Sequence, residues 1–224
     1  MEQKGKLIVF EGIDGSGKSA HYKRVCEHLE RDGIDYKHIV FPRYDKESSA
    51  LIRMYLGGEF GGSPADCNAY TSSAFFAVDR FAAYRTDWGG YYHDGGFVLS
   101  DRYTTSNAVH QGSKLPEEEL EAYFEWLYDF EYVKMELPRP DLVIYLEVDL
   151  ETSLARMRRR QEKTNTDGDI HEKDIEYLER CLRTADRAAN HYGWHRIACM
   201  RDGQERSIDE KHGEIYGIIL DALK

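Results

Sequence analysis

The sequence predicts an α/β fold in which a parallel sheet of five strands carries helices on both faces. Short apolar runs alternate with helical patterns along the chain, which is the order that parallel sheets require. The first run also passes through a glycine-rich turn straight into a helix, as βα units do. The runs predicted as strands cover residues 7–11, 36–41, 97–100, 142–146 and 196–200. Ligands bind beyond the carboxyl ends of the strands in such sheets, so the polar groups that follow each strand are the candidates for a site.

Length and composition fit one globular domain, and we predict a single domain over residues 1–224. With 30 basic and 41 acidic residues, the formal net charge is −11, which argues against nucleic acids and anionic membranes as partners. Residues 1–10 lack a signal-peptide pattern, and no run is long and apolar enough to span a bilayer. We expect a cytoplasmic protein with reduced thiols and no structural zinc, because no metal-binding spacing joins its cysteines, which are Cys26, Cys67, Cys181 and Cys199.

The turn after the first strand has the phosphate-loop pattern Gly12-x-x-x-x-Gly17-Lys18-Ser19. Its glycines, with Gly15, allow the backbone to curl so that amide N–H groups point at an anion, and the following helix adds its positive end. Lys18 would reach the β- and γ-phosphates of a nucleoside triphosphate, and the Ser19 hydroxyl would bind Mg²⁺. The alternative is a glycine turn that only closes a βα unit. The strand and the helix on either side favour the three-layer fold of P-loop NTPases.

Two places in the next segment suit a second, acceptor molecule. Arg43 follows the second strand, where a guanidinium could grip a phosphate, although a surface loop arginine is the plain alternative. A long helix is predicted over residues 64–88, and in it Phe76 and Arg80 are four positions apart and share a face. Together they could stack on a planar base and donate hydrogen bonds to it. The alternative is that Phe76 belongs to the core.

The third strand leads directly into Asp101 and Arg102. An acidic residue at the end of an apolar strand, in a chain that has a phosphate loop, suits the carboxylate on the Mg²⁺ side of the site. Arg102 follows where it could meet a phosphate. A dense polar segment comes next, which could also be a loop that caps a helix. It includes Ser106, Asn107 and His110.

Four arginines lie within five positions of the segment 150–172, namely Arg156, Arg158, Arg159 and Arg160. The residues after them have the Thr, Asn, Asp and Gly composition of an exposed loop. We interpret residues 156–171 as a mobile lid, whose arginines would offset charge on the phosphoryl group, because the phosphate loop itself contains no arginine. The alternative is a solvated basic helix end. The aromatic-rich helix predicted over residues 116–135 is interpreted as core or oligomer surface.

Taken together, these motifs resemble the thymidylate kinases, the nucleoside monophosphate kinases that phosphorylate dTMP. The resemblance rests on FEGIDGSGKS, FPRYD, FFAVDR, DRYTTSNAVHQ and a late basic lid followed by DIHE, in this order over most of the chain. It implies Mg²⁺-dependent transfer of the γ-phosphate of ATP to dTMP, in dTTP synthesis, by a homodimer formed through helices. A kinase for a deoxynucleoside or another monophosphate, and a nucleotide-binding regulatory module without transfer activity, are the alternatives.

The resemblance also assigns roles on the donor side of the reaction. It implies ATP binding by the loop residues Gly12, Asp14, Gly15, Ser16, Gly17, Lys18 and Ser19. It implies that the metal ion is held by Ser19 and Asp101. The residues implied to act on the transferred group are Lys18, Asp101, Arg102 and the lid arginines, for which Arg158 and Arg160 are the candidates. Spacing does not decide which of the four lid arginines acts.

On the acceptor side, the resemblance implies dTMP binding by Asp14, Arg43, Phe76, Arg80, Arg102, Ser106, Asn107 and His110. Arg43 and Arg102 would hold the dTMP phosphate, and Arg80 would bond a thymine carbonyl. Phe76 would stack on the base. His110 falls where the family commonly has an aromatic residue, often Tyr, that screens against a ribose 2′-hydroxyl.

Overall fold

The computed structural model describes residues 5–164, 175–201 and 203–224. At its centre is a sheet of five parallel strands in the order β2-β3-β1-β4-β5, which confirms the predicted architecture. Each strand begins and ends within two residues of its predicted bounds. The strands are β1 (Lys6–Glu11), β2 (Lys37–Val40), β3 (Phe97–Asp101), β4 (Leu142–Glu147) and β5 (His195–Ala198).

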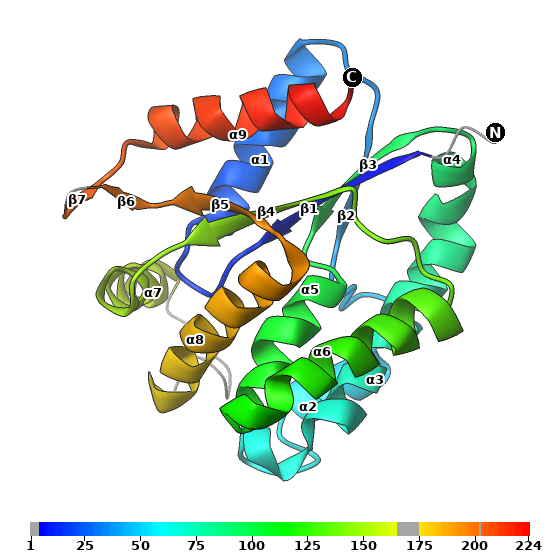
Figure 1. The fold of residues 1–224 in the computed structure, drawn as a ribbon, viewed down its shortest axis with the longest axis vertical. Helices are drawn as coiled ribbons and strands as arrows, with labels where there is room; N and C mark the ends of the chain where they lie inside the picture. The colour runs from blue at the N-terminus through cyan, green and yellow to red at the C-terminus, as the bar shows by residue number, and fades with distance from the viewer. Residues whose placement is uncertain (1–4, 165–174, 202) are drawn as a thin grey trace.

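Helices cover both faces of the sheet (Figure 1). Helices α1 (Lys18–Arg31) and α9 (Ile208–Ala222) lie on one face, and the other helices lie on the opposite face. The central strand β1 is buried on both sides, because helices cover both faces of the sheet. Successive side chains of a strand point to opposite faces, so they join different cores. Ile8 and Phe10 join the core beneath α1 and α9, whereas Leu7 and Val9 join the larger core on the other face.

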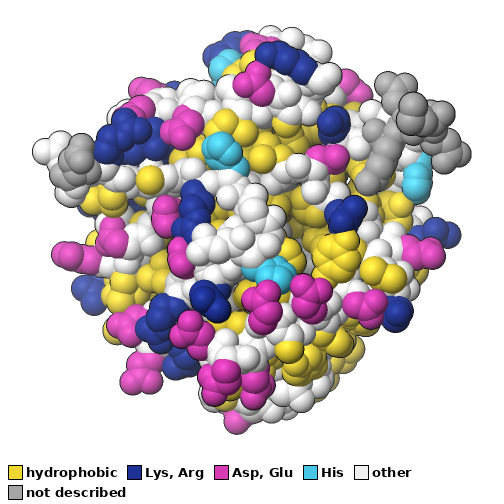
Figure 2. Space-filling model, in the orientation of Figure 1, with side chains coloured by type: hydrophobic (Ala, Val, Ile, Leu, Met, Phe, Trp, Pro, Cys, Tyr) yellow, Lys and Arg dark blue, Asp and Glu magenta, His cyan; other side chains and the backbone are white. Residues whose placement is uncertain are grey.

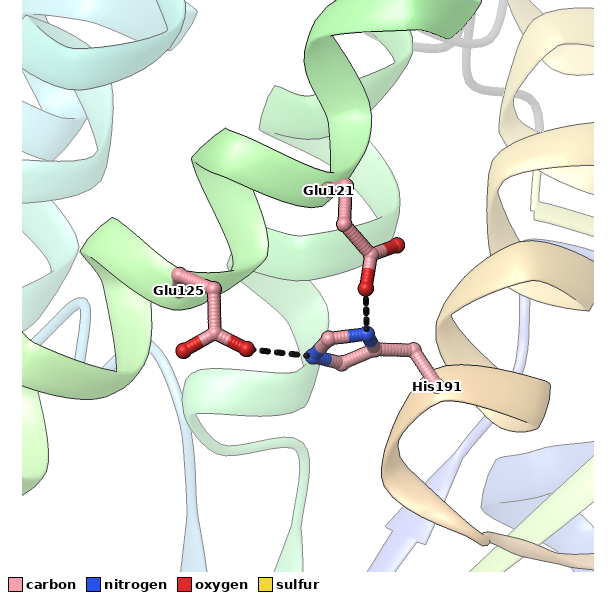
Figure 3. Close-up of side chains that lie close together, drawn as sticks. All are labelled: Glu121, Glu125 and His191. Carbon is pink, nitrogen blue, oxygen red and sulfur yellow. Dashed lines mark hydrogen bonds and ion pairs between the residues drawn. The ribbon is translucent and has the colours of Figure 1, made fainter.

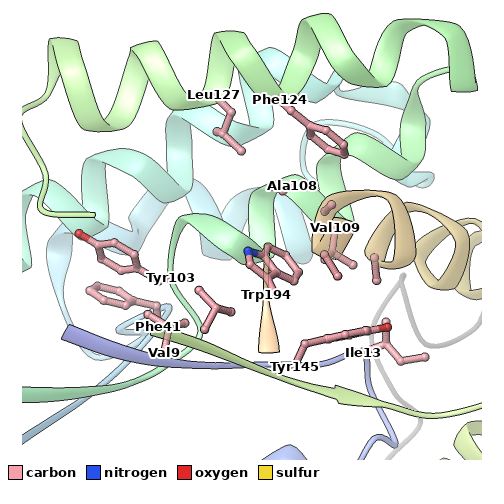
Figure 4. Close-up of a cluster of buried hydrophobic side chains, with 14 of the residues drawn as sticks. Val9, Ile13, Phe41, Tyr103, Ala108, Val109, Phe124, Leu127, Tyr145 and Trp194 are labelled. Carbon is pink, nitrogen blue, oxygen red and sulfur yellow. The ribbon is translucent and has the colours of Figure 1, made fainter. Parts of the chain in front are cut away.

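The larger core has two tiers of helix above the sheet (Figure 4). Val9 and Tyr145 rise from the strands, Ala108 and Val109 form the middle tier, and Phe124 and Leu127 reach down from α6. The middle tier therefore fixes the segment that follows β3, which carries the polar residues of interest. The helices of this face are α2 (Ala50–Leu56), α3 (Ala69–Ala83), α4 (Gly89–His93), α5 (Thr104–Ser106), α6 (Leu120–Tyr128), α7 (Leu150–Thr164) and α8 (Ile175–Tyr192).

The single helix predicted over residues 64–88 is wrong in its bounds. A short turn at Pro64–Asp66 comes first, and α3 begins separately at Ala69. The reason is a local cap, because the Asn68 side chain accepts a hydrogen bond from the Thr71 amide at 2.8 Å and fixes the helix start there. After α3 the chain continues through a wider helical turn at Tyr84–Trp88.

The helix predicted over residues 116–135 also differs from the observed one. Helix α6 spans only its middle, and a wider turn at Asp129–Lys134 follows. This turn carries Glu131 into the interior, where its side chain is fully buried. At the other end of the sheet, the last predicted strand stops at Ala198. The next residues form a short antiparallel pair, β6 (Met200–Arg201) with β7 (Gln204–Glu205).

Acidic and basic side chains are interspersed over the face shown in Figure 2, with apolar side chains between them. Within the described residues, no helix combines the length and the apolar character that a membrane crossing needs.

Candidate active site

A cavity of about 520 Å³ opens at the carboxyl ends of β1, β2 and β3. Its walls come from the phosphate loop, from the segments after β2 and β3, and from α3 and α7. Most of the predicted site residues line it, namely Asp14, Gly15, Ser16, Gly17, Lys18, Ser19, Phe76, Arg80, Asp101, Arg102, Ser106, Asn107 and His110. The predicted residues Gly12, Arg43 and Arg158 are not part of this lining, and the side chain of Arg160 lies outside the described residues.

The phosphate loop is held in a tight curl. Gly17 has a φ of 89°, a left-handed conformation that favours glycine, directly before α1 begins. A Cβ atom on Gly12 would come within 2.6 Å of the Ser16 Oγ atom, so this position needs glycine as well. Ser16 Oγ is buried and has no hydrogen-bond partner among the described residues. The loop thus presents backbone amides and a buried hydroxyl at a helix N-terminus, an arrangement that suits an anion.

Lys18 is buried where the loop meets β3. Its Nζ atom forms an ion pair with the Asp101 carboxylate. Burial and the nearby Arg102 guanidinium lower the pKa of Lys18, and the Asp101 carboxylate opposes this shift. Lys18 is thus held against the Asp101 carboxylate beneath the loop.

Helix α7 docks on the phosphate loop from the other side of the cavity. Ser153 donates a hydrogen bond to the Asp14 carbonyl at 2.7 Å. Arg156 donates from Nη1 to the carbonyls of Gly15 and Ser16 at 3.0 and 2.8 Å, and its Nη2 atom pairs with Glu205 at 2.6 Å. Among the described side chains of α7, Arg156 is the arginine that lines the cavity, and it is one of the four arginines between which the spacing did not decide. Arg158 is exposed, because helix positions two apart point in nearly opposite directions.

Arg102 links both ends of the cavity. Its Nη2 atom donates to Asp14 at 3.0 Å, and its Nη1 atom donates to Ser106 Oγ at 3.3 Å. Burial alone would lower the pKa of Arg102, but the Asp14 and Glu11 carboxylates outweigh it and raise the pKa. The residue also has a φ of 68°, which is uncommon outside glycine and turns its side chain into the cavity at the end of β3.

Glu11 is a functional candidate that the sequence analysis missed. Its carboxylate is fully buried below Arg102 at the end of β1. It accepts hydrogen bonds from the Gly12 amide at 2.8 Å and from the Thr105 and Ser106 hydroxyls at 2.6 Å each. Arg102 Nη1 lies 3.5 Å away. The available signal was an acidic residue inside an apolar strand, since a buried carboxylate needs partners.

Glu131 is the second missed residue, and it holds Arg80. The guanidinium of Arg80 donates from Nε and Nη2 to the two Glu131 oxygens at 2.6 Å each. The third nitrogen, Nη1, donates to the Tyr103 carbonyl at 3.3 Å. Asn107 joins the same carboxylate at 3.1 Å. Phe76, four positions before Arg80, is only partly buried and lines the cavity, so the predicted pairing of an aromatic ring with a guanidinium on one face of α3 is present.

Arg43 is occupied away from the cavity. Its Nε atom donates to the Asp79 carboxylate at 3.2 Å, and its backbone amide donates to the same carboxylate at 2.8 Å. The neighbouring residues Pro42 and Tyr44 do line the cavity. In this structure Arg43 therefore anchors the segment after β2 to α3.

A separate group of ionisable side chains lies between α6 and α8 (Figure 3). His191 Nδ1 lies 2.8 Å from Glu121, and His191 Nε2 lies 3.6 Å from Glu125. The two carboxylates meet different edges of the ring, whereas a metal ion would need both near one ring nitrogen. These contacts link α6 to α8 through one histidine that lies between two carboxylates.

Comparison with known proteins identifies the family. The sequence model of the thymidylate kinase family matches residues 10–210. The thymidylate kinase of Mycobacterium tuberculosis is 31% identical over 179 residues, which cover 78% of this chain and 81% of that protein. A probable thymidylate kinase of Methanococcus maripaludis is 29% identical over 224 residues, with 97% and 96% covered.

A solved structure of thymidylate kinase from Candida albicans has the same fold. It superposes with a TM-score of 0.69 at 20% identity, and the match covers 99% of this chain and 94% of that one. The sequence matches span the phosphate loop, the segments after β2 and β3, and most of the cavity lining. The chain therefore belongs to the thymidylate kinase family of ATP-dependent phosphotransferases.

Proposed function

We propose that this cavity carries out the reaction ATP + dTMP → ADP + dTDP, with ATP on the phosphate loop and dTMP between α3 and the segment after β3. One observation carries the proposal: a single cavity is lined by residues 14–19 and also by Phe76, Arg80 and Arg102. A protein that only binds or hydrolyses a nucleoside triphosphate has no need of the second set. Phosphoryl transfer needs both, because the acceptor must stand in line with the γ-phosphate.

On the donor side, the loop amides and Lys18 would hold the triphosphate. Ser19 and Asp101 are proposed to bind Mg²⁺, and the fit is chemical: both line the cavity and both offer the oxygen ligands that this ion prefers. When bound, Mg²⁺ would neutralise charge on the β- and γ-phosphate oxygens. The pairing of Lys18 with Asp101 would keep the lysine and the carboxylate side by side beneath those oxygens.

On the acceptor side, Arg102 would hold the dTMP phosphate, one oxygen of which attacks the γ-phosphorus. No general base is needed, because this phosphate is already anionic; positioning and charge stabilisation supply the catalysis. Phe76 would stack on thymine and Arg80 would bond a carbonyl of the base, with Ser106 and Asn107 nearby. A contact between Arg43 and the dTMP phosphate stays a prediction, since Asp79 holds that guanidinium here.

For the charge that develops in transfer, we propose Arg156 as a source from α7. Its guanidinium already touches the carbonyls of Gly15 and Ser16, next to the place where the γ-phosphate would lie. The roles of Arg158 and Arg160, and the lid over residues 156–171, stay predictions. Part of that segment, residues 165–171, lies outside the described residues.

ADP release, measured with ATP, Mg²⁺ and a panel of nucleosides and monophosphates, tests the proposed reaction. We expect turnover that depends on the acceptor and is fastest with dTMP. Faster turnover with thymidine than with dTMP would indicate a deoxynucleoside kinase. ADP release at the same rate with and without acceptor, or no release at all, would contradict the transfer reaction.

We also propose that the chain forms a homodimer and works in the cytoplasm. On α3, Val78 and Phe81 are 48% and 39% exposed, which is unusual for apolar side chains three positions apart on one helix face. Light scattering of the purified protein tests the dimer, and Phe81→Glu should lower the measured mass towards one chain. A wild-type protein that is monomeric at the micromolar concentrations of the assay would contradict it.

A further inference from the structure

One oxygen atom of Glu205 lies close to two cations. Its Oε1 atom is 2.6 Å from Nη2 of Arg156 and 3.8 Å from Nζ of Lys211. Among the described residues, no other carboxylate comes within ion-pair distance of either cation. The hydrogen bond from Arg156 lowers the pKa of Glu205, and the charge of Lys211 lowers it further. Glu205 is therefore a carboxylate that links α7 to α9.

The two terminal nitrogens of Arg156 have different partners. Nη1 donates to the carbonyls of Gly15 and Ser16 at 3.0 and 2.8 Å, and Nη2 donates to Glu205 at 2.6 Å. A guanidinium is planar and rigid, so a partner that fixes Nη2 also fixes the direction of Nη1. Glu205 therefore determines where Arg156 presents its charge at the phosphate loop.

The segment that carries Glu205 is fixed without any contribution from α7. Glu205 lies in β7, which pairs with β6, and the next residue, Arg206, is buried. Arg206 donates from Nη1 to the Ala198 carbonyl of β5 at 3.0 Å. Its Nε and Nη2 atoms donate to Glu210 and Glu214 of α9 at 2.9 and 2.6 Å. The Glu205 carboxylate is thus attached to a rigid support, against which the side chain of Arg156 can be held.

The alternative role for Glu205 is to balance the charge of Lys211, which is only 2% exposed. The distances favour Arg156, because 2.6 Å is a hydrogen bond and 3.8 Å is too long for one. Glu205 is also absent from the lining of the cavity, whereas Arg156 is part of it. An effect of Glu205 on turnover would therefore have to pass through Arg156.

We propose that Glu205 is a positioning residue for phosphoryl transfer, which holds the Arg156 guanidinium beside the proposed γ-phosphate position by accepting a hydrogen bond from Nη2. This inference rests on the role of Arg156 under the proposed function. It predicts that loss of the Glu205 carboxylate lowers kcat and leaves the KM for dTMP unchanged, because Arg156 belongs to the donor end.

ADP release at saturating ATP and dTMP tests the inference with Glu205→Ala, Glu205→Gln, Arg156→Ala and the double variant. Glu205→Ala should lower kcat about fivefold, as expected for the loss of a partly exposed ion pair. Glutamine keeps an acceptor for Nη2, so Glu205→Gln should recover part of that loss. In the Arg156→Ala background, Glu205→Ala should cause no further loss of kcat, since the residue that it positions is gone. The side chain of Glu205 is 54% exposed, and denaturant unfolding checks that each variant is folded.

Lys211→Met is the matched control on the other partner of the same carboxylate. Methionine keeps an unbranched buried side chain and removes only the cation, so kcat should stay within about twofold of the wild type. A loss of kcat as large as that of Glu205→Ala would show that Glu205 acts through Lys211 and would overturn the inference. Equal effects of Glu205→Ala in the wild-type and Arg156→Ala backgrounds would also overturn it, whether or not Lys211→Met folds.

Arg156→Ala separates this failure from that of the proposed function. If Arg156→Ala keeps the wild-type kcat, the proposed role of Arg156 itself is wrong, and the role of Glu205 falls with it. If Arg156→Ala lowers kcat and Glu205→Ala does not, only the role of Glu205 fails.

Discussion

The donor and acceptor ends of the cavity are built in different ways. The proposed donor end is local, since residues 12–17 form the turn between β1 and α1, and Lys18 and Ser19 begin that helix. We propose that it binds mainly through the backbone. The acceptor end is assembled from side chains that are distant in sequence. Arg80 and Glu131 are 51 positions apart, and Arg102 and Asp14 are 88 positions apart.

At the acceptor end, acidic side chains hold the arginines in place. Each arginine at or beside the acceptor end is held by an acidic side chain: Arg43 by Asp79, Arg80 by Glu131, and Arg102 by Asp14 with Glu11 close by. An arginine side chain loses much conformational entropy when it is fixed, so a prior ion pair reduces the cost of ligand binding. The donor loop needs no such pairs for its amides, because the helix and the glycines fix the backbone. The two ends should therefore fail in different ways.

The largest effect is expected at the donor end, from Lys18→Ala. Removal of the cation beneath the β- and γ-phosphates should lower kcat about 10³-fold, since charge stabilisation is the main catalytic term in phosphoryl transfer. The KM for dTMP should change little, because Lys18 belongs to the donor end. Turnover is measured by ADP release, and dTMP affinity by calorimetry. Wild-type turnover in this variant would contradict the proposed role of the phosphate loop in catalysis.

The next largest effect is expected from Glu131→Ala, which tests whether the acceptor end depends on its carboxylates. The substitution leaves the Arg80 guanidinium buried without its partner, at a cost of about 3–5 kcal/mol in the free energy of unfolding. The KM for dTMP should rise, while the KM for ATP should change less. Glu131→Gln is the matched control, because glutamine keeps the shape of the side chain and one hydrogen-bond acceptor. Its stability and its KM for dTMP should fall between those of the wild type and those of Glu131→Ala. Denaturant unfolding measures the free energy of unfolding, and steady-state kinetics measures the KM values. Equal changes in the KM for dTMP and the KM for ATP would contradict a separate acceptor end.

The same contrast explains what the sequence could and could not predict. The strands and the glycine turn after β1 depend on local patterns, namely an apolar run, glycines at fixed spacing and a helix, and these elements were predicted correctly. The role of the turn as the donor loop stays a prediction. Glu11 and Glu131 were missed because their importance lies in side-chain partners 24 to 95 positions away, which no local pattern records. Glu131 also sits on a wider helical turn, which a regular helix of residues 116–135 does not contain.

The arginines of α7 show a second limit of sequence reasoning. Spacing indicated a basic cluster near the phosphates, but it did not give the rotation of the helix about its axis. Contacts remote in sequence set that rotation, including Ser153 with the Asp14 carbonyl and Arg156 with Glu205. Likewise, spacing did not show that the buried Asp79 takes the Arg43 guanidinium, and a contact between Arg43 and the dTMP phosphate stays a prediction.

Two variants on α7 test which arginine acts at the donor end, and the expected effect on kcat is intermediate in size. Arg156→Ala should lower kcat by about 10- to 100-fold, because it removes a charged hydrogen-bond donor beside the proposed γ-phosphate position. Arg158→Ala is the control on the same helix with the same change of charge, and its exposed side chain should matter less. ADP release at saturating ATP and dTMP measures both. A larger loss of kcat in Arg158→Ala than in Arg156→Ala would contradict the role of Arg156 and favour Arg158 as the arginine that stabilises charge during transfer.

The smallest effect is expected from Phe76→Leu, which keeps an apolar side chain but removes the aromatic face. Stacking of a base on an aromatic ring contributes about 1–3 kcal/mol relative to alanine, and leucine keeps part of that contact. A loss of about 1 kcal/mol is therefore expected, so the KM for dTMP should rise roughly fivefold, with kcat and the KM for ATP nearly unchanged. Phe76 is only partly buried, and its ring meets Tyr55 edge-on with the centroids 6.4 Å apart, so leucine should leave the fold stable. If thermal stability fell and the KM for dTMP did not move, Phe76 would belong to the core. Arg80, held by Glu131, would then be the remaining contact of α3 with the base.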